Sequence, residues 1–234
     1  MGVRIARGRV GRWVCRLRRL GRSCWVRVGV WLLGWWVYRW LARWVVPRVR
    51  FSTYYPRLTG RQYHRGYQVV QPGDILLSRD DWKLSTWIIP GVFPHVGLCV
   101  GHRYKAAWGV ARAASGVIGE VVEAVAAGVQ LVDFYDFCRE SDRVVILRCR
   151  DWDEGYVLSQ VLPRALGAVG RPYDNEFAFG PKALYCSEVP LHCDPEGRAK
   201  VKTRDLIGLG RRYVVAEDWL KARNVEVVWD SERD

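Results

Sequence analysis

The first 73 residues of this 234-residue chain contain no aspartate or glutamate, and the first acidic residue is Asp74. Sixteen arginines precede it, so the formal net charge of +13 comes from this part of the chain. The remaining 21 of the 37 basic residues stand against 24 acidic ones, a net charge of about −3 from Asp74 onward. A nucleic-acid-binding domain carries Lys and Arg over a folded face. We therefore expect no nucleic-acid partner.

The chain also lacks paired CxxC spacing, although it has seven cysteines, at positions 15, 24, 99, 138, 149, 186 and 193. An odd number without paired spacing argues against a zinc framework and against a complete disulfide framework. Cys99, Cys138 and Cys149 lie in apolar runs, and most of the cysteines are expected to be small buried side chains. A zinc site built from Cys186, His192 and Cys193 would need a fourth ligand that the sequence does not offer. We expect no metal and no other cofactor.

Residues 1–53 form a leader that lacks lysine as well as acidic residues and holds thirteen arginines and seven of the thirteen tryptophans. Its longest uncharged run, residues 28–38, is much shorter than the roughly 20 apolar residues of a membrane-spanning helix. Trp36, Trp40 and Trp44 recur at helical spacing beside arginines, which is typical of a helix among lipid headgroups. We predict that residues 25–46 form a basic helix on a membrane surface. A spanning helix and a disordered basic tail are the alternatives.

The rest of the chain has the composition of one folded domain, residues 73–234, preceded by a polar connector, residues 54–72. Apolar residues at helical spacing predict a helix over 153–169 and a shorter one over 217–223. Strands that cluster before the helices indicate an α+β fold. Short apolar runs bounded by turn residues predict those strands at residues 74–78, 95–101, 116–125, 143–149 and 225–229.

Cys186 differs from the other cysteines in its context, ALYCSEV, where an apolar lead-in is followed by residue types suited to a first helical turn. A thiol at a helix start, facing an imidazole, is the arrangement of a papain-type nucleophile. Pro190 is compatible with a helix that begins near Cys186 and predicts a short one. Tyr185, next to the thiol, is expected to pack in the core, and a part in the oxyanion hole is the alternative.

Five short motifs occur in an order that resembles the YiiX-like family. This family belongs to the permuted branch of the NlpC-type cell-wall peptidases, in which histidine precedes cysteine because a papain-like fold has been cut and rejoined. The resemblance covers residues 71–189. It implies a circularly permuted papain-like catalytic domain over residues 73–234, with an antiparallel sheet packed against helices. The motifs are residues 71–77 (QPGDILL), 93–98 (FPHVGL), 122–124 (VEA), 170–177 (GRPYDNEF) and 184–188 (LYCSE).

By position, the resemblance implies Cys186 as nucleophile, His95 as its base and Glu123 as the carboxylate that orients His95. Glu120, three residues before Glu123, would point to the opposite face of the strand. Residues 103–115 are expected to be an insertion between the base and the carboxylate. The other motif residues with polar side chains are expected to be structural, namely Asp74, Tyr173 and Asp174.

The resemblance thus implies a cysteine hydrolase, an amidase or peptidase that works through a thioacyl-enzyme, with cell-wall peptides as the default substrate. Two alternatives stay open. One is a lipid-directed acyltransferase or thioesterase of the lecithin:retinol acyltransferase type, and the other is a noncatalytic membrane adaptor that retains the fold. The expected partners are a peptide or acyl-lipid substrate and a membrane surface.

The arginines of the leader also bear on location. Nine arginines precede Val28 and five lie between Pro47 and Asp74, which modestly favours a cytoplasmic N-terminus if the leader spans a membrane. We therefore expect a membrane-associated protein of the cell envelope with its catalytic domain outside. A position on the cytoplasmic face is the alternative.

Overall fold

The computed structural model describes residues 56–81, 91–101, 119–175, 179–180, 182–206 and 211–234, together with Trp40. Apart from Trp40, the leader helix predicted over residues 25–46 lies outside these ranges, as does the predicted insertion, residues 103–115. Within the described ranges, no helix is both long enough and apolar enough to cross a membrane.

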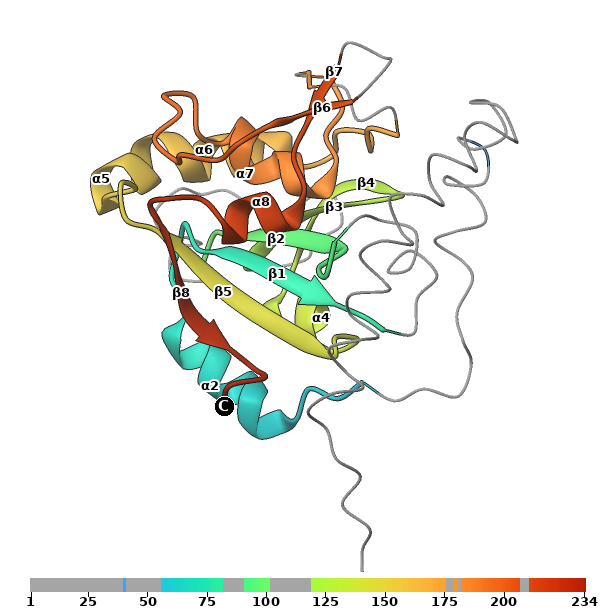
Figure 1. Cartoon of the computed structure of the whole chain (residues 1–234), viewed down its shortest axis with the longest axis vertical. Coiled ribbons are helices and arrows are strands. Elements are labelled where there is room, and N and C mark those ends of the chain that lie inside the picture. The colour runs from blue at the N-terminus through green and yellow to red at the C-terminus, as the bar shows by residue number, and fades with distance from the viewer. Residues whose placement is uncertain are drawn as a thin grey trace, which may run out of the picture.

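A six-stranded antiparallel sheet with the order β4-β3-β2-β1-β5-β8 forms the centre of the fold (Figure 1). A separate pair of short strands, β6 and β7, lies beyond it. The strands are β1 (Ile75–Arg79), β2 (His95–Cys99), β3 (Val121–Val125), β4 (Gly128–Val132), β5 (Arg143–Cys149), β6 (Arg204–Leu206), β7 (Arg211–Tyr213) and β8 (Val225–Asp230).

The predicted strands 74–78, 95–101, 143–149 and 225–229 are confirmed as β1, β2, β5 and β8. The predicted strand 116–125 corresponds to β3 in its second half, and β4 follows it through a two-residue turn. Successive side chains of a strand point to opposite faces, so the sheet separates two cores. On β5, Val145 and Leu147 enter the larger core, whereas Val144 and Ile146 enter the smaller one.

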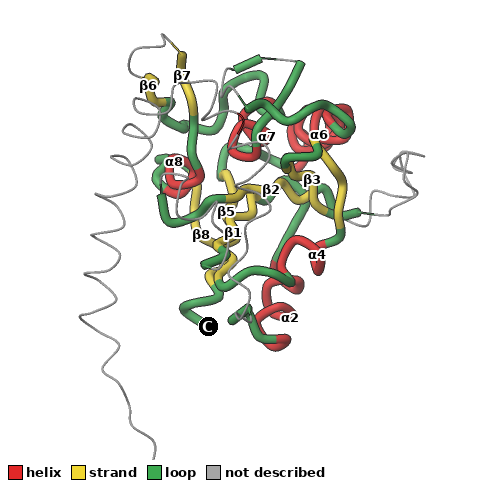
Figure 2. The backbone as a smooth tube through the Cα atoms, turned by 90° about the vertical axis from the view of Figure 1, so that its right-hand side faces the viewer, coloured by secondary structure: helices red, strands yellow, loops and turns green. Residues whose placement is uncertain are grey.

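Helices cover both faces of the sheet (Figures 1 and 2). The helix predicted over residues 153–169 is confirmed. It consists of α5 (Glu154–Tyr156), a π-helical turn (Val157–Val161) and α6 (Leu162–Ala168) in succession. It begins at Asp153, whose carboxylate accepts a hydrogen bond from the Tyr156 amide at 2.9 Å. The larger core lies under α5 (Glu154–Tyr156), α6 (Leu162–Ala168), α7 (Val189–His192) and α8 (Ala216–Leu220), and the smaller one under α2 (Gly60–Val69) and α4 (Phe134–Cys138).

Helix α2 lies within residues 54–72, which the polar composition predicted to be a connector. Thr59 begins the helix with a reciprocal capping box, in which its hydroxyl accepts from the Gln62 amide and the Gln62 side chain accepts from the Thr59 amide. Tyr63 packs on Phe134 of α4, with ring centroids 5.6 Å apart. One face of the helix is formed by Tyr63 and Tyr67, which stack on each other and both pack on Phe134. The polar composition of the segment hides this amphipathic face.

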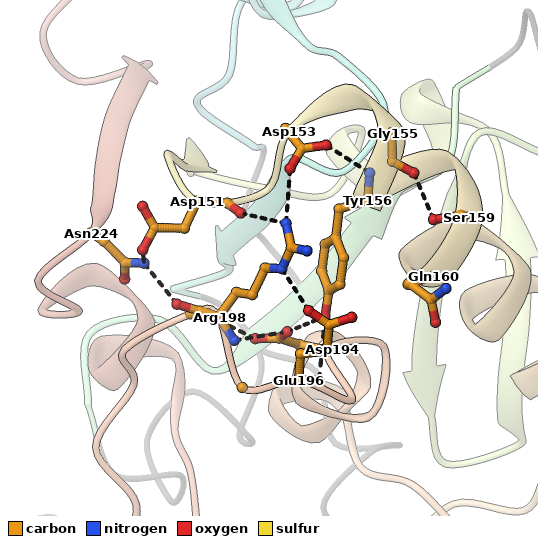
Figure 3. A network of polar contacts seen from close by, with 12 residues as sticks. Asp151, Asp153, Gly155, Tyr156, Ser159, Gln160, Asp194, Glu196, Arg198 and Asn224 are labelled. Carbon is orange, nitrogen blue, oxygen red and sulfur yellow. Dashed lines mark hydrogen bonds and ion pairs between the residues drawn. The ribbon is translucent and has the colours of Figure 1, made fainter.

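A polar network fixes the loop that follows α7 (Figure 3). The carboxylate of Asp194 accepts hydrogen bonds from the Tyr156 hydroxyl at 2.5 Å, from the Arg198 amide at 3.0 Å and from the Ala199 amide at 2.7 Å. The guanidinium of Arg198 lies 3.8 Å from the centroid of the Tyr156 ring and pairs with Asp153 at 2.8 Å. The end of α7 is therefore tied to the start of α5.

Candidate active site

Cys186 is the first residue of a 3-10 turn, Cys186–Glu188, that continues directly into α7. The extended Tyr185 precedes it, and Pro190 occupies the first turn of α7, where its missing N–H costs no helical hydrogen bond. The expectation of a short helix beginning at Cys186 is confirmed. The cysteine is 7% exposed, so its thiol reaches solvent only at the edge of the core.

The thiol reaches β2 at the point where β2 and β3 stop pairing. The ladder between these strands ends at Gly97 and Glu123, whereas β3 continues its pairing with β4 as far as Val125. The Cys186 sulfur lies 3.8 Å from the Pro94 carbonyl oxygen, just before β2 begins. The interrupted ladder thus lets a residue from the helical layer approach the start of β2.

His95 is the first residue of β2, and its Nε2 lies 2.6 Å from Oε2 of Glu123. The register pairs Gly97 with Glu123, so His95, two residues before Gly97, lies on the same face as the carboxylate. The ring of Phe137 packs against the imidazole, with centroids 5.6 Å apart. His95 and Cys186 are close enough to shift each other's pKa, and with Nε2 beside Glu123 the nitrogen left for the thiol is Nδ1.

These contacts shift the pKa values of the thiol and the imidazole in opposite directions. Burial alone would raise the pKa of Cys186, but the hydrogen bond from His95 and its positive charge hold it below its ordinary value. Burial alone would lower the pKa of His95, but the charge of Glu123, with hydrogen bonds to Cys186 and Glu123, raises it above its ordinary value. Both shifts favour a thiolate–imidazolium pair.

The other four described cysteines show the opposite behaviour. Burial raises the pKa of Cys99 to about 12 and that of Cys149 to about 11, and it raises the pKa values of Cys138 and Cys193 as well. Each is a buried, free thiol in the structure, as expected for small core residues. Among the described cysteines, therefore, only Cys186 combines a lowered pKa with a histidine partner.

Residues 170–174 join the strand beside Glu123 to the lead-in of Cys186. On one side, the Val129 amide donates to the Arg171 carbonyl and the Gly170 amide donates to the Val129 carbonyl, both at 2.8 Å. On the other side, Tyr173 pairs with Leu184 in an isolated parallel bridge. These contacts give residues 170–173 of the motif a structural part and support the expectation that Tyr173 is structural.

Tyr185 and Asp74, two polar residues of the motifs, have hydrogen-bond partners away from Cys186 and His95. The Tyr185 hydroxyl accepts a hydrogen bond from the Val214 amide at 2.9 Å, and its ring stacks on Phe179. Asp74 accepts from the Gln71 amide at 2.7 Å and forms a two-point ion pair with Arg148. Tyr185 therefore packs in the core, and Asp74 fixes the turn before β1.

The remaining histidines lie away from Cys186 and His95, or outside the described residues. His64 is exposed on α2, and His102 lies in a range that is not described. His192 Nε2 lies 3.1 Å from the Arg171 guanidinium, and burial followed by the charge of Arg171 lowers its pKa. No group of three His, Cys, Asp or Glu side chains within the described ranges is placed to hold a metal ion, and Cys186, His192 and Cys193 form no such group.

Gln130 is a site residue that the sequence patterns did not reveal. It lies on β4 directly opposite Glu123, and its side-chain amide donates to Glu123 Oε1 at 2.7 Å. The expectation that Glu120 points to the opposite face is wrong, because Glu120 precedes β3 and its carboxylate accepts hydrogen bonds from the Tyr67 hydroxyl of α2 and the Phe134 amide of α4, on the side that Val121 and Glu123 also face. It contacts these groups and not His95. The available signal was the two-residue turn before Gly128, which pairs β3 with β4 and sets Gln130 against Glu123.

The topology, with His95 before Cys186 in the chain, defines a circularly permuted papain-like fold. Residues 69–224 match the family described as the permuted papain-like amidase enzyme, YaeF/YiiX, C92 family. The chain belongs to this family, and the family resemblance noted in the motifs is confirmed. It is therefore a papain-like cysteine amidase or peptidase in general terms.

A solved structure supports the same fold. It is the metalloprotein yiiX from Escherichia coli O157:H7, which is 18% identical to this chain over 69% of this chain and 97% of that one, with a TM-score of 0.53. At this level of identity, the similarity concerns the fold alone. A search of curated proteins found no match.

Proposed function

We propose that the protein is a cysteine amidase in which Cys186 is the nucleophile and His95 is the base. Glu123 orients His95 and stabilises its protonated form. The observation that supports this proposal most strongly is the convergence of three elements on one point. The 3-10 turn before α7 supplies the thiol, β2 supplies the imidazole 2.6 Å from Glu123, and β3 supplies that carboxylate.

In the proposed reaction, the Cys186 thiolate attacks the carbonyl carbon of an amide and forms a carbon–sulfur bond. The backbone amide of Cys186 stabilises the resulting oxyanion. Protonated His95 gives its proton to the leaving nitrogen, the carbon–nitrogen bond breaks, and a thioester remains. His95 then removes a proton from water, which attacks the thioester, and the thiolate is restored as the acid leaves.

Membership of an amidase family favours a peptide as the substrate class, and we propose peptides of the cell wall as the first candidates. We propose also that the leader, residues 1–53, holds the domain at a membrane surface, because thirteen arginines and seven tryptophans suit anionic headgroups. Under this arrangement acyl lipids are the second substrate class, and the leader composition is the observation that favours them.

The experiment uses the full-length protein with two substrates, soluble muropeptides and vesicles of anionic phospholipid. Mass spectrometry follows the new amine or the released fatty acid. The proposal predicts muropeptide cleavage that is lost in Cys186→Ala and in His95→Ala. Release of fatty acid alone would replace the amidase by the lipid-directed enzyme. Equal turnover by the wild type and Cys186→Ala, or no reactivity of Cys186 towards any thiol probe, would refute the proposed chemistry.

A further inference from the structure

Glu123 contacts two different groups through its two oxygens. Oε2 lies 2.6 Å from His95 Nε2, and Oε1 accepts a hydrogen bond from Gln130 Nε2 at 2.7 Å. The carboxylate is 7% exposed, and Gln130 is partly buried beside it. Because the two oxygens of a free carboxylate are equivalent, a donor fixed on one side determines which oxygen faces the histidine.

The backbone of β4 around Gln130 is hydrogen-bonded on both sides of the strand. Glu123 and Gln130 are directly paired in the ladder between β3 and β4. On the outer edge of β4, the neighbouring Val129 exchanges hydrogen bonds with the 170–171 segment, both at 2.8 Å. Gln130 therefore presents its amide from a fixed strand, and its position is linked to the same segment that leads to Cys186.

The chemistry of an amide suits this position. Its N–H donates to a carboxylate at every pH and brings no charge of its own. A hydrogen bond to the ionised form stabilises the carboxylate against the burial that would otherwise favour its protonation. A hydrogen bond to a charged group is also roughly twice as strong as one between neutral groups.

We propose that Gln130 is a positioning residue of this site, which keeps Glu123 ionised and aimed at His95 and thereby sustains the thiolate of Cys186. The inference rests on the proposed function, since it assigns Gln130 a part in activating the same thiol. A cross-strand pair with a purely structural role would contribute to folding stability but would leave the pH dependence of Cys186 unchanged.

The test measures the rate at which iodoacetamide alkylates Cys186 in the full-length protein from pH 5 to 9, with each cysteine followed by mass spectrometry. Gln130→Met keeps the size of the side chain and removes the donor. We expect its Cys186 rate at pH 6 to fall about tenfold, because the lost bond is one to a charged group. Gln68→Met, an exposed glutamine on α2, is the matched control and should leave the rate unchanged.

Gln130→Glu makes the test independent of whether the methionine variant folds. Protonated at low pH, the new carboxyl group donates to Glu123 as the amide does, so the rate at pH 5 should stay within about threefold of the wild type. As the pH rises, two carboxylates in contact cannot both ionise without repulsion. We expect the profile of this variant to gain an inflection that the wild type lacks.

The outcomes separate this inference from the proposed function. If wild-type Cys186 reacts no faster than an ordinary thiol at pH 6 and does not depend on His95, the proposed function fails, and the inference fails with it. If wild-type Cys186 is activated but Gln130→Met and Gln130→Glu both retain its rate and its pH profile, the proposed function stands and the role of Gln130 is refuted.

Discussion

Replacing Glu123 by glutamine should abolish most of the activation of Cys186 while leaving the shape of the site intact. The amide oxygen can still accept a hydrogen bond from His95 Nε2, which lies 2.6 Å from the carboxylate in the structure. What disappears is one negative charge. With the charge centres about 4 Å apart and an effective dielectric constant of about 20, its attraction for the imidazolium is about 4 kcal/mol.

That energy corresponds to about three pKa units, or about a thousandfold in the equilibrium between the neutral pair and the thiolate–imidazolium pair. We expect Glu123→Gln to lower the alkylation rate of Cys186 at pH 6 by about 100- to 1,000-fold. The wild-type rate should change little between pH 6 and 8, whereas the rate in the variant should rise about tenfold per pH unit, as for an ordinary thiol below its pKa.

The matched control is Glu120→Gln, the same chemical change three residues earlier in the chain, just before β3. Its carboxylate contacts Tyr67 and Phe134 rather than His95, so the Cys186 profile should not move. If Glu123→Gln keeps the flat profile and a rate within threefold of the wild type, Glu123 does not supply the charge that stabilises the imidazolium, and the electrostatic reasoning is wrong.

Three further substitutions test the surroundings of the site. Gly128→Ala should destabilise the protein by about 1–3 kcal/mol in thermal unfolding, because Gly128 has φ +123° and a Cβ there would lie 2.7 Å from the Arg171 carbonyl. The control is Gly167→Ala, which has open space around it and should not destabilise the protein. Tyr185→Phe should lower the free energy of unfolding by about 1–3 kcal/mol, because it leaves the Val214 amide unpaired. It should leave the pH profile of Cys186 alkylation unchanged, and a changed profile would favour the alternative part of Tyr185 in the oxyanion hole. Burial raises the pKa of Glu188 to about 7, so between about pH 4.5 and 7 the folded state binds more protons than the unfolded state. The free energy of unfolding of the wild type should therefore fall as the pH rises through this range. Denaturant titrations of Glu188→Gln should show no such fall.

The sequence predicts the elements that apolar patterning defines, and it misses those held by polar or aromatic contacts. Strand β5 has the predicted bounds because RVVILRC is a continuous buried run. Helix α2 was missed because its packing depends on Tyr63, which contacts Phe134, and on Gly66, where an added Cβ would lie 3.0 Å from the ring of Trp229. Neither partner is near in sequence.

The same limit applies to the site. Motif order was enough to bring Cys186, His95 and Glu123 together as a hypothesis. The alternation argument against Glu120 did not hold, because Glu120 precedes β3 and bonds to residues of α2 and α4. Gln130 could not be found in this way, because its role follows from the register between β3 and β4. The early end of the ladder between β2 and β3, near which the thiol lies, is likewise a property of pairing rather than of composition.

The central claim, that Cys186 is an activated nucleophile served by His95, is tested most directly by competitive labelling of all seven cysteines with a thiol-reactive probe at pH 6 to 7. The account predicts that Cys186 is labelled selectively, with a rate nearly independent of pH in this range, and that His95→Ala removes this selectivity. Labelling of Cys186 no faster than that of Cys15 or Cys24, or labelling that is unchanged in His95→Ala, would contradict it.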